Sequence, residues 1–107
     1  MDRESYTIVI RKYKKNLKAL GISAKKIILY GSHVSGRSRE DSDLDLIVVS
    51  DDFEEMDLWD RLWILGQARI DIEQPMEILG LTEEEFESEG KGTFIGDEVK
   101  SKGIEVT

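Results

Sequence analysis

Apolar residues recur at helical spacing near the start of the chain. Five of them follow one another at steps of four and three, which predicts one face of a helix over about residues 4–20: Tyr6, Ile10, Tyr13, Leu17 and Leu20. Lysines fill much of the remaining helix surface, and Gly21 stands where a helix-ending glycine belongs. Because the whole chain is acidic, we interpret these lysines as a solvated face rather than as a patch for nucleic acid.

Three short apolar runs predict strands. Residues 27–30 are β-branched or bulky, and residues 44–49 are almost entirely apolar, which is typical of a central strand covered on both faces. Residues 76–81 alternate well enough to form a third strand. Pro75 argues that residues 69–75 form a loop or a short edge strand, because proline cannot donate a hydrogen bond to a sheet.

A second long helix is predicted over residues 56–67. It carries a broad apolar stripe made of Leu58, Trp59, Leu62, Trp63 and Leu65. Its two tryptophans suit either a protein interface or the core. We predict the core, because a small domain needs such bulk to bury enough apolar surface.

The C-terminal part of the chain adds smaller elements. Thr82 with Glu85 three residues later is a capping box, which predicts the start of a helix. A short helix near residues 97–102 and an edge strand over 104–106 follow. This order predicts an α/β (α+β) fold, a single domain over residues 1–107 with helices on a small mixed sheet.

Charge and composition narrow the classes of function. The formal net charge is −8 with a pI near 4.7, which argues against independent binding of nucleic acid. Cysteine is absent, which excludes disulfides and thiolate metal sites. No apolar run approaches the roughly 18 residues of a membrane span, and the polar N-terminus does not read as a signal peptide. We therefore expect a soluble, cytoplasmic protein without membrane association.

Residues 31–46, GSHVSGRSREDSDLDL, hold the candidate chemistry. A turn at Gly31-Ser32, between the first strand and a short helix, would present backbone N–H groups to a phosphate. Asp43 and Asp45 are two residues apart, so on a strand their side chains project the same way. Magnesium accepts one or two carboxylates together with water and phosphate oxygens, and two such ions can support an in-line displacement. A triphosphate held at the turn would have its α phosphorus over these ions.

Each part has an ordinary alternative. A Gly-Ser pair after a strand is usually only a turn, and an Asp-x-Asp pair is often a solvated strand start. Two features favour a site: the aspartates adjoin an apolar strand, where unpaired charge is costly, and the turn precedes them by a short loop.

This stretch resembles the GSxxxGxxxxxSDxDL signature of the minimal nucleotidyltransferases, in the polymerase-beta-like superfamily. The matching positions are Gly31, Ser32, Gly36, Ser42, Asp43, Asp45 and Leu46. The segment MEILGLTEEEF at residues 76–86 is also similar to the family's strand with a third acidic residue, followed by a Thr-x-Glu-Glu-Phe helix start.

The resemblance implies roles for particular residues. Gly31 and Ser32 would bind the nucleotide phosphates, and Asp43 and Asp45 would ligate two magnesium ions. The third acid, here Glu77, would act as a catalytic metal ligand or general base.

Three further positions are assigned with less support from the motif. Ser42 and Arg37 join the candidate phosphate-binding set, although Arg37 reads equally well as part of a polar loop. His33 suits either a phosphate contact or a surface position without a role.

Among the acids that precede Thr82, Glu77 is the one placed on a strand. Asp71 and Glu73 are separated from that strand by Pro75, so their direction relative to the aspartates is not fixed.

The resemblance implies a magnesium-dependent nucleotidyltransferase that moves an NMP group, AMP from ATP, from an NTP to a hydroxyl acceptor. Standalone members are often paired with a HEPN-type helical protein as a toxin–antitoxin couple, so we expect such a partner or a homo-oligomer. Two alternatives stay open. One is an antitoxin that acts by contact alone, and the other is a nucleotide-binding regulatory domain without transfer.

Overall fold

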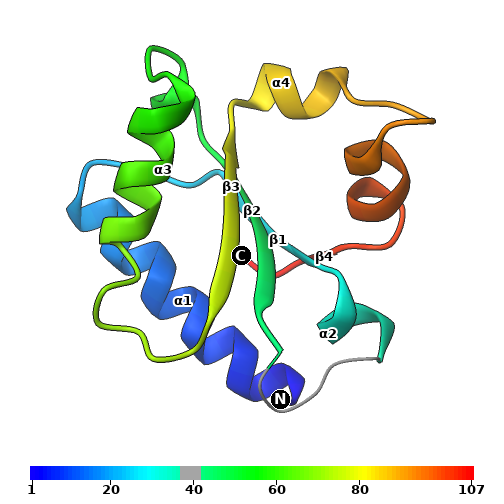
Figure 1. Cartoon of the computed structure of the whole chain (residues 1–107), viewed down its shortest axis with the longest axis horizontal. Coiled ribbons are helices and arrows are strands. Elements are labelled where there is room, and N and C mark those ends of the chain that lie inside the picture. Colours follow the sequence, from blue (N-terminus) through cyan, green and yellow to red (C-terminus); the bar gives the residue numbers. More distant parts are fainter. Residues whose placement is uncertain (37–41) are drawn as a thin grey trace.

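The computed structural model describes residues 1–36 and 42–107. Its elements in chain order are α1 (Arg3–Ala19), β1 (Lys26–Tyr30), α2 (Ser32–Ser35), β2 (Leu44–Val49), the 3-10 turn η1 (Asp51–Phe53), α3 (Leu58–Gln67), β3 (Met76–Leu81), α4 (Glu83–Ser88), the π-helical η2 (Ile95–Lys100) and β4 (Ile104–Glu105) (Figure 1). The predicted helices and strands are all present, with small shifts at their ends. No helix in the described ranges is long and apolar enough to cross a membrane.

The four strands form one mixed sheet in the order β3-β2-β1-β4. β1 pairs antiparallel with β2 and with β4, whereas β2 and β3 run parallel. Strand β2 therefore has a neighbour on each side, and its apolar residues are fully buried. This confirms the predicted fold class and the predicted central position of residues 44–49.

Side chains alternate between two faces of the sheet, and each face has its own helical cover. On the first face, Leu44, Leu46 and Val48 join a core cluster with residues of α1 and α3. On the second face, Ile47 and Val49 pack with residues of α4 and η2. Figure 1 shows α1 and α3 on one side of the sheet and α4 and the orange-red η2 on the other. Because β2 alternates, its one charged residue, Asp45, belongs to the second face.

Helix α1 confirms the predicted apolar face except at Leu20, which follows the helix and is 43% exposed. Asp2 caps its N-terminus by accepting a hydrogen bond from the Ser5 N–H at 2.8 Å. The inward residues are buried: Tyr6, Ile10, Tyr13 and Leu17. The Tyr13 hydroxyl donates to the Leu65 carbonyl at 2.8 Å, which joins α1 to α3 inside the first core.

The prediction that the tryptophans of α3 lie in the core is wrong. Trp59 is 77% exposed and Trp63 is 65% exposed, and Leu65 is the one buried residue of the predicted stripe. The inward side of α3 is formed by Arg61, Leu65 and Ala68, at steps of four and three. Apolar residues stand on both sides of this helix, so their spacing alone does not tell which side faces the core.

Candidate active site

Three polar side chains form a row across the second face, where β2 begins. Asp45 lies opposite Tyr30 of the antiparallel β1 and opposite Glu77 of the parallel β3. Residues directly opposite one another on neighbouring strands point to the same face, so the three side chains are neighbours. The carboxyl groups of Asp45 and Glu77 are therefore adjacent across the two strands. The structure thus brings Glu77 to Asp45, as the strand position of Glu77 suggested.

This row concentrates negative charge. Partial burial, the adjacent Glu77 carboxyl group and the charge of Asp43 raise the pKa of Asp45 to about 6, while His33 opposes them. Burial, and then the charges of Asp45 and Glu77, raise the pKa of the Tyr30 hydroxyl. Closely spaced carboxylates resist ionising together, and a bound cation removes that resistance. The row is electrostatically suited to a cation.

Gly31 forms the turn that joins β1 to α2, and it lies directly against Asp45. Its φ is +80°, a conformation that L side chains rarely adopt, and a Cβ built there would collide with the Asp45 carboxylate. The backbone N–H groups of Ser32 and His33, at the start of α2, donate no hydrogen bond within the described parts of the chain. The predicted turn therefore leaves free donors beside the carboxylates.

The approach to β2 is held by contacts to the Ser42 backbone oxygen. Gln74 Nε2 donates to it at 3.1 Å, and His33 Nε2 lies 3.0 Å from it. The other ring nitrogen of His33, Nδ1, is buried and has no partner among the described residues. His33 therefore has a backbone contact that the sequence did not indicate. Asp43, which follows Ser42 in the chain, is exposed at the edge of the row formed by Tyr30, Asp45 and Glu77.

The donor set fits a hard divalent cation that completes its shell from substrate. Within residues 1–36 and 42–107, no group of three or more His, Cys, Asp or Glu side chains is arranged to hold a metal ion. Magnesium does not need such a cage, because it takes one or two carboxylates and fills its octahedron with water and phosphate oxygens. Asp45 and Glu77, with Asp43 beside them, supply oxygen ligands of that kind. Arg37, the predicted basic phosphate contact, lies outside the described residues.

Asp71, the alternative third acid, lies on another part of the molecule. It accepts a hydrogen bond from Asn16 Nδ2 at 2.8 Å and pairs with Lys12 of α1 at 3.6 Å. These partners hold it on the α1 side of the sheet, away from the row. Glu73 is exposed in the loop before β3.

A cavity of about 360 Å³ adjoins the Gly31 turn, between α2 and η2. Its other lining residues are Val34, Ser35, Glu98 and Lys102. This volume lies within the usual range for small-molecule sites. Near the same turn, the ring of Tyr30 makes an edge contact with Phe94, with centroids 5.6 Å apart. Sequence reasoning missed both aromatic residues, although Tyr30 immediately precedes Gly31.

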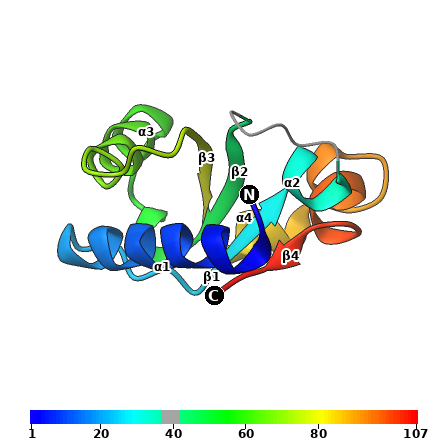
Figure 2. The same cartoon turned by 90° about the horizontal axis from the view of Figure 1, so that it is seen from below.

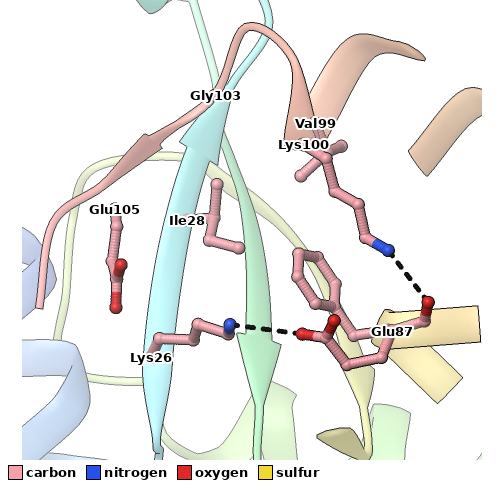
Figure 3. Close-up of a pocket in the computed structure, with 8 residues that line it drawn as sticks. Lys26, Ile28, Glu87, Val99, Lys100, Gly103 and Glu105 are labelled. Carbon is pink, nitrogen blue, oxygen red and sulfur yellow. Dashed lines mark hydrogen bonds and ion pairs between the residues drawn. The ribbon is translucent and has the colours of Figure 1, made fainter. Parts of the chain in front are cut away.

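A second cavity, of about 390 Å³, lies between β1, α4 and η2 and is separate from the carboxylate row (Figure 3). Its ammonium groups are already engaged. Lys26 pairs with the Glu87 carboxylate at 3.7 Å, and Lys100 donates to the Glu87 carbonyl at 3.2 Å. Both ammonium groups also lie about 5 Å from the Phe86 ring, at 4.9 and 5.0 Å. We therefore assign this cavity no part in the active site.

Comparison with known proteins decides the family. The model of the nucleotidyltransferase domain family matches residues 10–106 of the chain. The chain belongs to this family. Since nucleotidyltransferases move nucleotidyl groups from nucleoside triphosphates, this nucleotidyltransferase is a transferase with an NTP substrate. The match agrees with the resemblance to the minimal nucleotidyltransferases.

A solved structure shows the same fold. The crystal structure of a Sulfolobus solfataricus protein assigned as a nucleotidyltransferase is similar, with a TM-score of 0.57 and 19% sequence identity over 90% of this chain and 79% of that chain. Another protein with that assignment is 28% identical over 78% of this chain and 84% of its own, with a TM-score of 0.48. No curated protein matches the chain significantly.

Proposed function

We propose that this nucleotidyltransferase moves an AMP group from ATP, with magnesium, to a hydroxyl group on a partner protein. The observation that carries the proposal is the close approach of the Gly31 turn to Asp45, with Glu77 opposite Asp45 on the neighbouring strand. A turn with free N–H donors and a carboxylate pair are the two parts that phosphoryl chemistry on a triphosphate needs.

The residues divide the work between binding and proton transfer. The N–H groups of Ser32 and His33 hold the terminal phosphates at the Gly31 turn, with Ser42 and Arg37 completing the phosphate contacts. Magnesium, held by Asp43, Asp45 and Glu77, supplies charge neutralisation when bound.

Transfer is an in-line displacement at the α phosphorus. The acceptor oxygen forms a bond to this phosphorus while the bond from it to the pyrophosphate oxygen breaks. The acceptor proton passes to the Glu77 carboxylate, and pyrophosphate leaves.

The acceptor class follows from charge and from family resemblance. A chain with a net charge of −8 repels nucleic acid, which disfavours an RNA or DNA hydroxyl as the acceptor. Standalone members of the resembling family pair with HEPN-type helical proteins. We therefore propose a hydroxyl side chain on such a protein, in a toxin–antitoxin couple, as the acceptor.

One observation favours a second candidate, a module that binds Mg-ATP or its partner without transfer. The described residues offer no three-ligand metal group, and Glu77 is one methylene longer than the aspartate common in the resembling family. A longer side chain loses more rotamer freedom when it is fixed for catalysis.

The experiment incubates the protein and a co-expressed HEPN-type partner with magnesium and ATP labelled at the α phosphate. Transfer predicts labelled partner, a mass increase of one AMP, and matching pyrophosphate release. Asp45→Asn should remove all three signals, whereas the matched change Asp71→Asn, far from the row, should leave them intact. Mg-ATP binding without label favours the second candidate. Absence of Mg-ATP binding overturns the transfer proposal, and absence of both Mg-ATP binding and partner binding overturns the second candidate as well.

A further inference from the structure

The outward side of α3 is an exposed apolar surface. Its residues Leu58, Trp59, Leu62 and Trp63 are 56, 77, 41 and 65% exposed, respectively. Trp59 and Trp63 are one turn apart and therefore neighbours on the helix, and they are the only two tryptophans of the chain. A contiguous apolar patch on a protein surface marks an interaction site, since leaving such area in water is unfavourable. We refer to these four residues as the α3 patch.

Acidic side chains lie at the N-terminal end of the α3 patch. Glu54, Glu55, Asp57 and Asp60 lie in or just before α3 and are all exposed. None of the four forms an ion pair within residues 1–36 and 42–107. The one basic residue of the helix, Arg61, does not offset them. Its side chain is turned inward, 12% exposed, and paired with Glu85 at 2.6 Å. The patch therefore carries an uncompensated negative rim.

We infer that the α3 patch docks a protein segment that presents apolar side chains flanked by lysine or arginine. Tryptophan is enriched among the residues that dominate binding energy at protein interfaces, and the acidic rim complements a basic surround. The same rim repels nucleic acid and anionic membranes. It also disfavours a second copy of this chain, because a two-fold interface centred on the patch would bring the two acidic rims together.

This surface is separate from the active site. Helix α3 covers the first face of the sheet with α1, whereas Asp45 and Glu77 point to the second face. Figures 1 and 2 show α2, which follows the Gly31 turn, on the opposite flank from α3. A partner on the α3 patch therefore leaves the Gly31 turn open, and the inference does not depend on the proposed transfer reaction.

The test uses the intrinsic fluorescence of the full chain, because both tryptophans lie on the patch. The probe is a synthetic amphipathic helical peptide with a leucine face and lysine flanks, and its comparator carries glutamate in place of every lysine. With the lysine peptide, we expect the tryptophan emission to shift to shorter wavelength and to saturate at one peptide per chain. The glutamate peptide should cause no such shift. Raising the salt concentration tenfold should weaken binding by about tenfold, as screening removes the rim contribution.

Two variants assign the binding to the patch and its rim. Leu58→Gln/Leu62→Gln keeps both tryptophans and should weaken binding by about tenfold or more, because it removes apolar contact area. Glu54→Gln/Glu55→Gln/Asp60→Asn should weaken binding and flatten its salt dependence. Ile8→Gln, a change of the same kind at the 63% exposed Ile8 of α1, is the matched control and should leave binding unchanged.

Three outcomes would overturn the inference. The first is binding of the lysine peptide that stays unchanged both in Leu58→Gln/Leu62→Gln and in Glu54→Gln/Glu55→Gln/Asp60→Asn. The second is a blue shift with phosphatidylcholine or phosphatidylglycerol vesicles in place of the peptide. The third is a dimer in sedimentation at low salt that Leu58→Gln/Leu62→Gln dissociates. Far-ultraviolet circular dichroism confirms that each variant is folded, as expected for changes at exposed positions.

Discussion

Asp45 and Glu77 lie directly opposite each other on the parallel strands β2 and β3. Partial burial, the adjacent Glu77 carboxyl group and the charge of Asp43 raise the pKa of Asp45 to about 6, so Asp45 keeps its proton to a higher pH than a free aspartate does. Without a cation, the folded chain binds this proton more tightly than the unfolded chain does. The contribution to stability is therefore complete below about pH 4 and is lost as the pH rises to about 6.

Asp45→Asn should remove this pH dependence. At pH above about 6 the metal-free variant should be as stable as the parent or more stable, by less than about 3 kcal/mol, because a partly buried charge is gone and solvent screens part of the effect. Urea unfolding from about pH 4 to about pH 7 measures the effect, and Asp71→Asn should keep the slope of the parent. An unfolded Asp45→Asn variant, or one that keeps the parent's slope, would contradict this account of Asp45.

Gly31→Ala should damage both stability and nucleotide binding. The new Cβ would meet the Asp45 carboxylate at a φ of +80°, so the turn or the carboxylate must move. We expect a loss of about 1–3 kcal/mol in the free energy of unfolding, and loss of Mg-ATP binding in calorimetry.

The matched control for this change is Gly21→Ala. Gly21 has a φ of +95° but open space where the Cβ would stand. It should lose about 1 kcal/mol from backbone strain and keep full Mg-ATP binding. Equal binding losses in the two variants would show that the contact between Gly31 and Asp45 has no role.

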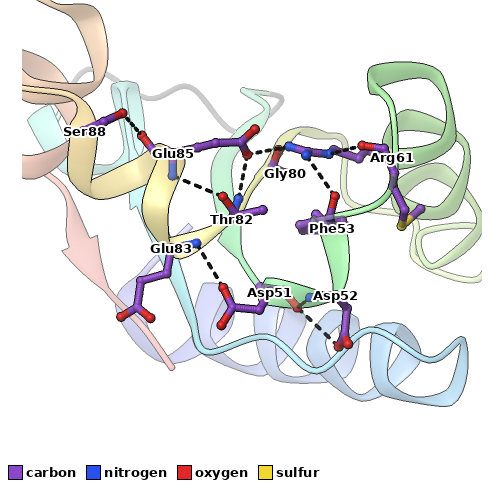
Figure 4. Close-up of polar contacts among 11 residues, drawn as sticks. Asp51, Asp52, Phe53, Arg61, Gly80, Thr82, Glu83, Glu85 and Ser88 are labelled. Carbon is purple, nitrogen blue, oxygen red and sulfur yellow. Dashed lines mark hydrogen bonds and ion pairs between the residues drawn. The ribbon is translucent and has the colours of Figure 1, made fainter.

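Arg61 is the polar anchor between α3 and the sheet (Figure 4). Its guanidinium donates to the carbonyls of Phe53, Met56 and Gly80 at 2.9, 3.0 and 3.2 Å, and to the Glu85 carboxylate at 2.6 Å. Arg61→Met removes all four interactions, although Phe53 and Glu85 each keep a backbone donor, from Met56 and Thr82. It should lower the free energy of unfolding by about 2–4 kcal/mol in urea titrations.

Lys102→Ala provides the comparison. It removes an exposed i,i+4 pair with Glu98, which should change stability by less than about 0.5 kcal/mol. A similar loss in both variants would argue that Arg61 acts as ordinary surface charge.

The sequence was most informative where one local rule decided the structure. Period-two alternation placed Glu77 on the same face as Leu79, and the capping box at Thr82 follows from short-range hydrogen bonds. That β3 lies beside β2, and so brings Glu77 to Asp45, depends on strand order. No local pattern specifies this order.

Two features of the structure could not be predicted from local sequence rules. Helix α3 has apolar residues on both sides, and the choice between them is made by Arg61, whose acceptors belong to distant segments. Tyr30 joins the carboxylate row only through its pairing with Asp45 across β1 and β2. Both depend on contacts between elements rather than on the spacing within one.

The identity of the third acid is the remaining test of the site. Glu77 lies directly opposite Asp45, whereas Asp71 is held by Asn16 and Lys12 on the α1 side. Glu77→Gln keeps the shape and hydrogen-bonding capacity of the side chain. It cannot take up the proton that the acceptor hydroxyl group loses. It should lower the rate of AMP transfer by about 100-fold or more while largely sparing Mg-ATP binding.

Glu77→Asp restores the carboxylate and should keep or improve transfer, because the shorter side chain loses less rotamer freedom when it is fixed. Asp71→Asn should be nearly silent, since its side chain has no path to the row. Single-turnover transfer and calorimetric Mg-ATP binding, measured on all three variants, separate catalysis from binding. If Asp71→Asn abolishes transfer and Glu77→Gln leaves it untouched, the third acid belongs to the loop before β3. The position of Glu77 opposite Asp45 would then be structural alone.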